Sequence, residues 1–226
     1  PFSLYRTFVI EEKFGFNKTT PKTYILDKLK SYLLLLIIGS LVLSLILYFF
    51  ESFGDMAWLY AWVAISGFLV LVQPLFALVI APMFNTFNPL EDGELKDKIN
   101  QFARRVNFPI SRIDVMDGSR RSSKANAYFS GLGKNKRIAL FDTLIEKHSV
   151  DELVSIIAHE VGHYKKKHNI KGLILGVIQT GIMFFMLSIF LNNSQLFAAF
   201  RMENLSVYAS LLFFSILYSP IELIMS

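Results

Sequence analysis

The 226-residue sequence contains no cysteine and few charged residues. Without cysteine, the chain can form no disulfide framework, no thiolate metal site and no cysteine nucleophile. Charged residues make up 18% of the chain, whereas soluble globular domains contain about 25%. Apolar residues make up 53% and mean hydropathy is +0.44, which excludes an intrinsically disordered chain. The composition therefore predicts a folded protein that is too apolar to be a water-soluble domain.

Four long runs of the sequence carry no charge, and they fall into two pairs. The first pair covers residues 32–50 and 56–84, and the second covers 172–200 and 205–221. The hydrocarbon core of a bilayer is about 30 Å thick and needs about 20 apolar residues per helix. A helix buried in a soluble protein is the alternative, but such helices rarely stay free of charge for so long. We therefore expect four membrane-spanning helices.

These runs divide the chain into four parts. Residues 1–30 form a polar N-terminal segment, 31–84 two transmembrane helices, 85–171 an insert of soluble composition, and 172–226 two further transmembrane helices. The N-terminal residues do not resemble a cleaved signal peptide, because they are polar and mixed in charge. The chain begins at Pro1 rather than at a methionine, and we expect both of its ends to be truncated.

The positive charge, which totals +5, is segregated along the chain. Of the 23 lysines and arginines, 22 lie in residues 1–30 and 85–171, which the first pair of spans places on one side of a membrane. The positive-inside rule assigns that side to the cytoplasm. We therefore expect a multi-pass protein of the bacterial inner membrane, or of the endoplasmic reticulum or inner nuclear membrane in a eukaryote. This topology also explains the basic clusters, so we expect no nucleic-acid partner.

The insert shows both helical and extended patterns. Apolar residues at three-and-four spacing predict a helix over 94–106, and alternation predicts a strand over 112–117. Two further extended stretches, 126–130 and 137–144, flank a glycine-rich turn at 131–136 and predict a β-hairpin. The predicted fold class is thus a mainly α, polytopic membrane protein with a small α+β insert that contains a β-hairpin.

The last helix of the insert carries a metal-binding pattern. Ser149 and Glu152 form a capping box that predicts the start of this helix. Residues 159–163 read H-E-V-G-H, and His159 and His163, four positions apart, lie on one helix face where both can bind one zinc ion. Glu160 is about 100° around the helix, beside the metal, where a carboxylate can take a proton from a metal-bound water and pass it to a leaving amine.

Two alternatives to a zinc site are a chance match and histidines satisfied by the backbone. The predicted cap and the apolar opposite face of the helix favour the metal. His148 and His168 do not fit the ligand spacing, and we expect solvated or interfacial roles for both. A third protein ligand is needed. After His168 the sequence offers two carboxylates, Glu203 and Glu222; topology disfavours the first, and we expect a structural role for the second.

The third ligand is therefore expected beyond Ser226, so this chain alone is not expected to be active. One zinc ion per chain is the expected cofactor.

With these residues in view, the chain resembles the type I CAAX prenyl endopeptidases, which are integral-membrane zinc metalloproteases. The likeness lies in five stretches that occur in order over almost the whole chain: 7–23, 80–85, 122–144, the 159–163 box and 218–223. The resemblance implies a helical membrane barrel around a water-filled chamber, with the zinc site near the cytosolic face. It also implies hydrolysis of the bond that releases the last three residues after a prenylated cysteine.

Position by position, the resemblance implies that His159 and His163 are zinc ligands and that Glu160 is the general base. It also implies that the strand with Asn126, Ala127 and Tyr128 lies beside the active site and binds substrate. A strand edge can hold an extended peptide by β-augmentation. Asn126 can donate a hydrogen bond to substrate, and a turn or strand-capping role is the alternative.

In the family, the third zinc ligand is a glutamate downstream of the stretch equivalent to 218–223, and further spans precede the equivalent of Pro1. The expected partners are a lipid bilayer and a prenylated or other peptide substrate. Two other functions stay open. One is a broader zinc protease for quality control of membrane proteins, and the other is a non-catalytic membrane scaffold that retains a metal site.

Overall fold

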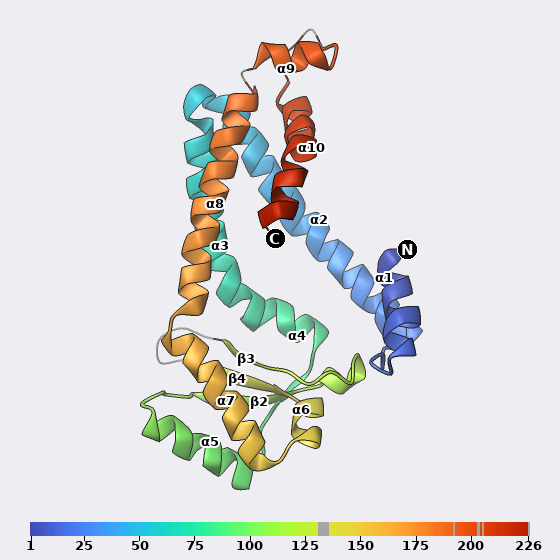
Figure 1. Cartoon of the computed structure of the whole chain (residues 1–226), viewed down its shortest axis with the longest axis vertical. Helices are drawn as coiled ribbons and strands as arrows, with labels where there is room; N and C mark the ends of the chain where they lie inside the picture. The colour runs from blue at the N-terminus through green and yellow to red at the C-terminus, as the bar shows by residue number, and fades with distance from the viewer. Residues whose placement is uncertain (131–135, 192, 203, 205, 226) are drawn as a thin grey trace. The chain divides into compact units, whose positions relative to one another are not determined.

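The computed structural model describes residues 1–130, 136–191, 193–202, 204 and 206–225, with the backbone alone for 221–225. The helices are α1 (Phe2–Tyr5), α2 (Pro21–Ser52), α3 (Ala57–Leu75), α4 (Ala81–Phe84), α5 (Glu94–Arg105), α6 (Asp142–Lys147), α7 (Val150–Lys165), α8 (His168–Leu191), α9 (Ser194–Ala199) and α10 (Val207–Met225) (Figure 1). The strands are β1 (Phe87–Pro89), β2 (Arg112–Met116), β3 (Ala127–Ser130) and β4 (Arg137–Phe141). Shorter helical pieces are π-helical at Arg6–Glu11 and Phe76–Ile80 and 3₁₀-helical at Gly54–Met56 and Gly118–Arg120.

The chain forms two compact units. The mixed unit comprises Pro1–Ser31 and Leu71–Ile170 and contains the four strands. The apolar unit comprises Tyr32–Val70 and Lys171–Ser226 and contains most of α2, α3 and α8. The chain is thus mainly helical with a small mixed sheet, as the sequence predicts.

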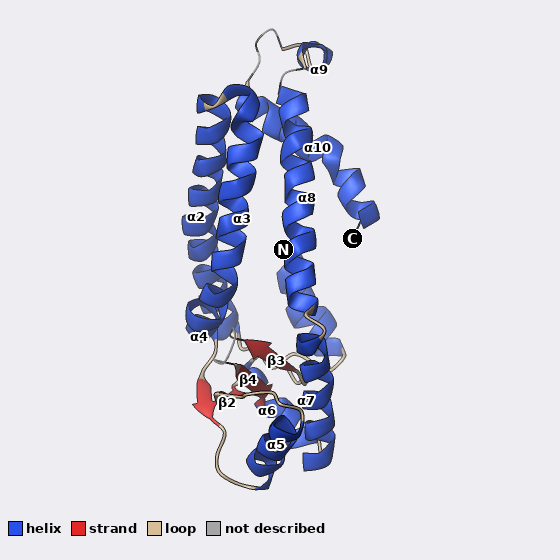
Figure 2. Ribbon diagram, turned by 90° about the vertical axis from the view of Figure 1, so that its left-hand side faces the viewer, coloured by secondary structure: helices blue, strands red, loops and turns tan. Residues whose placement is uncertain are grey.

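The sheet of the mixed unit has the order β1-β2-β4-β3 (Figure 2). The predicted hairpin is confirmed, because β3 and β4 pair antiparallel with Tyr128 opposite Ala139; most of its predicted turn, 131–135, lies outside the described residues. Strand β4 ends at Phe141, three residues earlier than the predicted stretch, because α6 begins there. The sequence did not predict that β2 and β4 pair in parallel or that β1 joins β2 antiparallel.

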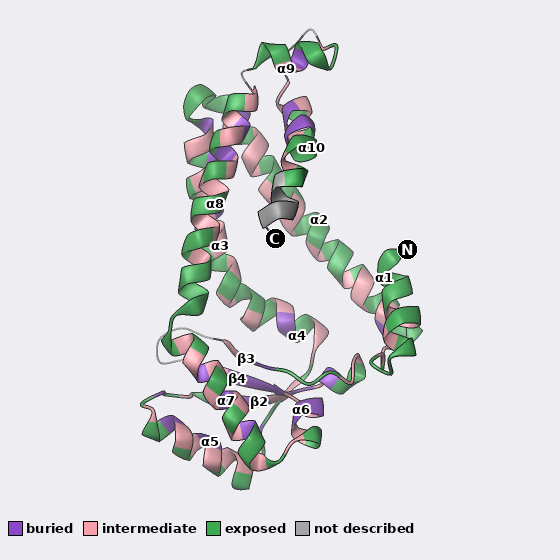
Figure 3. Ribbon diagram, viewed as in Figure 1, coloured by how far each residue is buried: buried purple, intermediate pink, exposed green. Residues whose placement is uncertain are grey.

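One hydrophobic core holds the mixed unit together, and Figure 3 shows buried residues along the sheet and α7. Helices α5 and α7 pack against each other, and α7 also packs against β3. Ile99 of α5, Leu140 of β4 and Ile157 of α7 are each 0% exposed. Full burial of such a side chain is worth about 1.5–3 kcal/mol, so the three elements fix one another's positions.

A buried ion pair crosses the centre of the sheet. Asp114 of β2 is 0% exposed, and its carboxylate accepts a hydrogen bond from Nε of Arg112 at 2.6 Å and another from Nε of Arg137 on β4. The Arg137 guanidinium lies 4.4 Å from the centre of the Phe87 ring. A buried carboxylate without such partners is strongly destabilising, so this cluster holds the two parallel strands in register.

The apolar unit has its own core, built around small residues of α3. Ala57 and Ala61 lie one turn apart and are 1% and 0% exposed, and small side chains at this spacing let helices approach closely. On the same helix, Trp62 donates a hydrogen bond from Nε1 to the carbonyl oxygen of Val177 on α8 at 2.8 Å. A Cβ atom added at Gly181 would lie 3.0 Å from the Trp62 ring, so a glycine allows this contact.

In the described part of the chain, three stretches of helix are long and apolar enough to cross a membrane: Pro21–Ser52, Gly54–Phe84 and His168–Leu191. Only 6%, 6% and 11% of their most apolar windows are buried, so their apolar surfaces require lipid or further protein as neighbours. Within the run predicted at 205–221, helix α10 begins at Val207, and its apolar part, Val207–Pro220, is shorter than the other three. A fourth span therefore stays a prediction.

Candidate metal centre

Helix α7 begins where the sequence predicts it. The hydroxyl of Ser149 accepts a hydrogen bond from the backbone N–H of Glu152 at 3.4 Å, and the Glu152 carboxylate accepts one from the backbone N–H of Ser149 at 2.8 Å. This reciprocal capping box satisfies two backbone donors that helix geometry would otherwise leave without partners. It sets the register of every residue that follows.

The helix presents two opposite faces. Leu153, Ile157 and Val161 recur every four residues and are buried. His159 and His163 each follow a buried residue by two positions, about 200° around the helix, and both are exposed. The core face therefore fixes the helix and leaves the two imidazoles free to bind a ligand.

The two histidines lie close enough to share one metal ion. Their Nε2 atoms are 3.1 Å apart and their ring centres 4.7 Å apart. Two nitrogens that bind one zinc ion tetrahedrally at about 2.0–2.1 Å are separated by about 3.3 Å. The rings therefore fit zinc with little rearrangement. Glu160, the next residue after His159, is partly buried and lies beside this pair on the helix.

The third ligand is not provided by the described part of the chain. Within it, no group of three or more His, Asp or Glu side chains is arranged to hold a metal ion. Of the two carboxylates downstream of His168, Glu203 and the side chain of Glu222 lie outside the described residues.

A third histidine contacts this pair, which sequence reasoning missed. Nδ1 of His168 lies 2.9 Å from Nδ1 of His163, so the contact uses the ring nitrogen of His163 that does not face His159. The spacing of five residues did not signal it, because positions five apart in a continuous helix lie about 140° from each other.

The candidate substrate strand, β3, is an edge strand. Within the described residues it pairs with β4 alone, so its other edge is available to an added strand. Ala127 is 7% exposed, Tyr128 is partly buried and Asn126 is exposed. The side-chain oxygen of Asn126 accepts a hydrogen bond from the backbone N–H of Ala127 at 2.9 Å, which is the strand-capping geometry considered from the sequence.

The phenol of Tyr128 remains a hydrogen-bond donor at neutral pH. Its burial raises the pKa of the hydroxyl above the ordinary value, although the nearby Arg137 charge acts in the opposite direction. Strand β3 packs on α7, with Ala127 and Phe129 in the same hydrophobic core as Ile157. The candidate substrate strand and the helix with the candidate metal ligands are thus parts of one packed unit.

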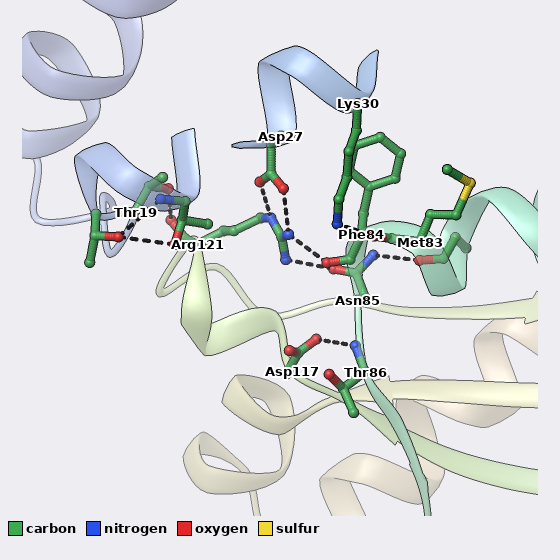
Figure 4. Close-up of polar contacts among 12 residues, drawn as sticks. Thr19, Asp27, Lys30, Met83, Phe84, Asn85, Thr86, Asp117 and Arg121 are labelled. Atoms are coloured by element: carbon green, nitrogen blue, oxygen red, sulfur yellow. Dashed lines mark hydrogen bonds and ion pairs between the residues drawn. The ribbon is translucent and has the colours of Figure 1, made fainter. Parts of the chain in front are cut away.

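A network centred on Arg121 ties the N-terminal segment to the loop that leads into β3 (Figure 4). Nε and Nη2 of Arg121 donate to the Asp27 carboxylate of α2 at 2.7 and 3.0 Å. Nη1 donates to the side-chain oxygen of Asn85 at 2.9 Å and Nη2 to the carbonyl oxygen of Phe84 at 2.5 Å. The Arg121 carbonyl oxygen accepts a hydrogen bond from the Thr19 hydroxyl at 2.9 Å. One side chain thus joins three segments that are distant in sequence.

An open pocket of about 550 Å³ lies beside this network in the mixed unit. Its lining includes Glu11, Lys28, Lys124 and Asn126, and Lys124 pairs with Glu11 at 3.3 Å. The pocket therefore connects the N-terminal segment with the start of the candidate substrate strand. No feature of the sequence pointed to it, because its walls come from segments about a hundred residues apart.

The sequence matches two described families in succession. Residues 1–86 match the family "CAAX prenyl protease N-terminal, five membrane helices", and residues 89–223 match "Peptidase family M48". The second match covers more than half of the chain and includes α7 with its histidines.

Curated relatives and a solved structure agree with this match. The chain is 39% identical to the probable CAAX prenyl protease 1 of Schizosaccharomyces pombe and 33% identical to the CAAX prenyl protease 1 homolog of Homo sapiens, over its whole length in both cases. It is 44% identical to CAAX prenyl protease 1 of Saccharomyces cerevisiae over 88% of its length. The crystal structure of S. mikatae Ste24p matches all of the chain with a TM-score of 0.91 and 38% identity.

The chain spans about half the length of these proteins: 48%, 56%, 44% and 56% in the order given. Its apolar helices and the match of its N-terminal residues to a membrane-helix family mark it as an integral membrane protein. The chain belongs to peptidase family M48.

Proposed function

We propose that this chain provides the metal-binding helix of a membrane zinc metalloendopeptidase that releases the last three residues of prenylated CAAX proteins. The observation that carries the proposal is the 3.1 Å separation of the His159 and His163 Nε2 atoms. It occurs on an H-E-x-x-H helix in a chain that aligns along its whole length with CAAX prenyl proteases. The names of those relatives support the substrate class.

His159 and His163 would hold one zinc ion through their Nε2 atoms. The third protein ligand would come from outside the described residues. When bound, zinc lowers the pKa of a water molecule and polarises the carbonyl group of the scissile bond.

Glu160 is proposed as the general base. Its carboxylate takes a proton from the attacking water, so that the water oxygen forms a bond with the carbonyl carbon. When the bond between that carbon and the amide nitrogen breaks, Glu160 passes the proton to the leaving amine. Proton balance is thereby restored without another acid.

Strand β3 is proposed to hold the substrate, through Asn126, Ala127 and Tyr128. An extended peptide that pairs with its available edge would be aligned by backbone hydrogen bonds. The basic N-terminal segment and insert support an orientation in which this strand and α7 face the cytoplasm.

The test is cleavage of a farnesylated CAAX peptide by the full-length protein and by Glu160→Gln. Loss of a general base lowers the rate by about 10²–10⁴-fold, whereas zinc content should stay at one ion per chain. The matched control is Glu146→Gln, an exposed carboxylate of α6, which should cleave at the wild-type rate. Unimpaired cleavage by Glu160→Gln would refute the assigned role.

The same assay with an unprenylated peptide tests the substrate class. Equal turnover with and without the lipid would favour a broader quality-control protease. A full-length protein that holds no stoichiometric zinc would favour a non-catalytic scaffold instead.

A further inference from the structure

A break between α7 and α8 places His168 against the metal-binding face. Helix α7 ends at Lys165, and the backbone N–H of Lys167 donates to the carbonyl oxygen of Tyr164 at 2.9 Å. Lys167 has a φ of 55°, a left-handed conformation that few non-glycine residues adopt. Helix α8 then begins at His168. The turn therefore brings His168 back to His163, which a continuous helix would not do.

The end of α7 that carries this turn is fixed by the core of the mixed unit. The Tyr164 ring meets the Phe108 ring edge to face, with centres 5.2 Å apart. Nζ of Lys165 donates to the carbonyl oxygen of Val106 at 2.5 Å. Both contacts hold the last turn of α7 against the segment that follows α5. The last turn of α7, which carries His163, is thus held in place by these contacts.

The two ring nitrogens of His163 face different partners. Nε2 faces His159, and Nδ1 faces Nδ1 of His168 at 2.9 Å. If Nε2 binds a metal, the ring proton of the neutral imidazole must be on Nδ1. That N–H then donates to Nδ1 of His168, which accepts with its own proton on Nε2. Most metal-binding histidines donate such a second hydrogen bond, which fixes the tautomer and the orientation of the ring.

We propose that His168 is a positioning residue for the metal site: it accepts the Nδ1–H hydrogen bond of His163 and so holds the Nε2 atom of His163 toward the metal. This inference rests on the proposed zinc function. His168 is not placed as a ligand itself, because it contacts the side of the His163 ring that points away from His159. The described residues hold no three-ligand group that includes it.

The test compares zinc affinity in the full-length protein, its His168→Asn variant and its His168→Leu variant. Asparagine places an acceptor oxygen at the position of Nδ1, whereas leucine has nearly the same shape and no acceptor. Loss of an outer hydrogen bond typically weakens metal binding by about 10–100-fold. We expect that loss in His168→Leu and most of the affinity restored in His168→Asn, with zinc measured by competition against a chromophoric chelator at constant pH.

His148→Leu is the matched control, because His148 precedes α7 at the opposite end and pairs with Glu152 at 3.7 Å; its zinc affinity should equal that of the wild type. Wild-type affinity in His168→Leu would overturn the inference. So would equal weakening in both His168 variants together with a lower thermal midpoint of the zinc-free protein, which would indicate a structural role. If the wild type itself binds no zinc, the proposed function fails instead.

Discussion

The two units of the chain place the same kinds of residue in opposite positions. In the mixed unit, leucine and isoleucine lie inside: Leu140 and Ile157 are 0% exposed. In the apolar unit many of them lie outside: Leu35, Leu175 and Ile178 are 68%, 66% and 51% exposed. The mixed unit therefore encloses its own core, whereas the apolar unit relies on an apolar environment for most of its surface. Helix α7, which carries the candidate metal ligands, belongs to the mixed unit.

The largest expected effect comes from the core beneath the histidines. Ile157→Ala removes a fully buried side chain two residues before His159, and such changes destabilise by about 2–5 kcal/mol. We expect a lower thermal midpoint of the full-length protein in detergent. The zinc content should fall as well, because α7 loses a buried side chain that holds it against the core.

Leu175→Ala is the control for this change, since it removes a comparable side chain that is exposed in the apolar unit. It should change stability by no more than about 0.5 kcal/mol. Equal losses in the two variants would mean that the two units do not differ in how they use their apolar residues.

A charged residue introduced into the apolar unit should impair the membrane insertion of α8 rather than the candidate metal site. Ile178 lies near the middle of α8, and arginine at a helix centre raises the insertion free energy by about 2.5–3.5 kcal/mol. We expect Ile178→Arg to reduce the fraction of chains in which α8 spans microsomal membranes, measured with a glycosylation acceptor introduced after Ala199. Ser155→Arg, on the exposed face of α7, should leave the insertion of α8 as in the wild type. A similar insertion defect in Ser155→Arg would contradict the expectation that only the apolar unit requires an uncharged surface.

The smallest expected effect is at the start of α7. Ser149→Ala removes an N-cap, which typically destabilises by about 1 kcal/mol.

Hydrogen bonds from the backbone and side chain of Ser149 lower the pKa of Glu152. A carboxylate with a lowered folded-state pKa stabilises the fold above its unfolded pKa, and this contribution is lost as the pH falls through the folded pKa.

Thermal midpoints measured from pH 7 down to pH 3 test this expectation. The wild type should lose stability at acid pH, and Glu152→Gln should lose less over the same range. An unchanged acid response in that variant would show that the capping carboxylate does not contribute. The uncharged core of α8 supplies no comparable titrating group, so this pH response should belong to the mixed unit.

Much of the fold and of the candidate site could be predicted from local patterns. The helix over 94–106, the strand over 112–117, the hairpin and the capped start of α7 are all confirmed. The long apolar helices and the family likeness are confirmed as well. The roles of His159, Glu160, His163 and Asn126 stay predictions until they are measured.

The parts that could not be predicted depend on contacts between distant segments. Arg121 meets Asp27 across 94 positions, and β2 pairs with β4 although β3 lies between them in sequence. In the same way, the approach of His168 to His163 required a left-handed residue between two helices.

The sequence by itself determined what depends on a few neighbouring residues: helix periodicity, the capping box, the four-residue spacing of two histidines and the length of each apolar run. These follow from bond geometry and hydrogen bonding within one or two turns. Only the tertiary structure decided which strands pair, which charges meet and which nitrogen of His163 receives a partner. Those outcomes depend on the packing of segments that are far apart in the sequence. Local propensities act within one or two turns and do not determine how such segments pack.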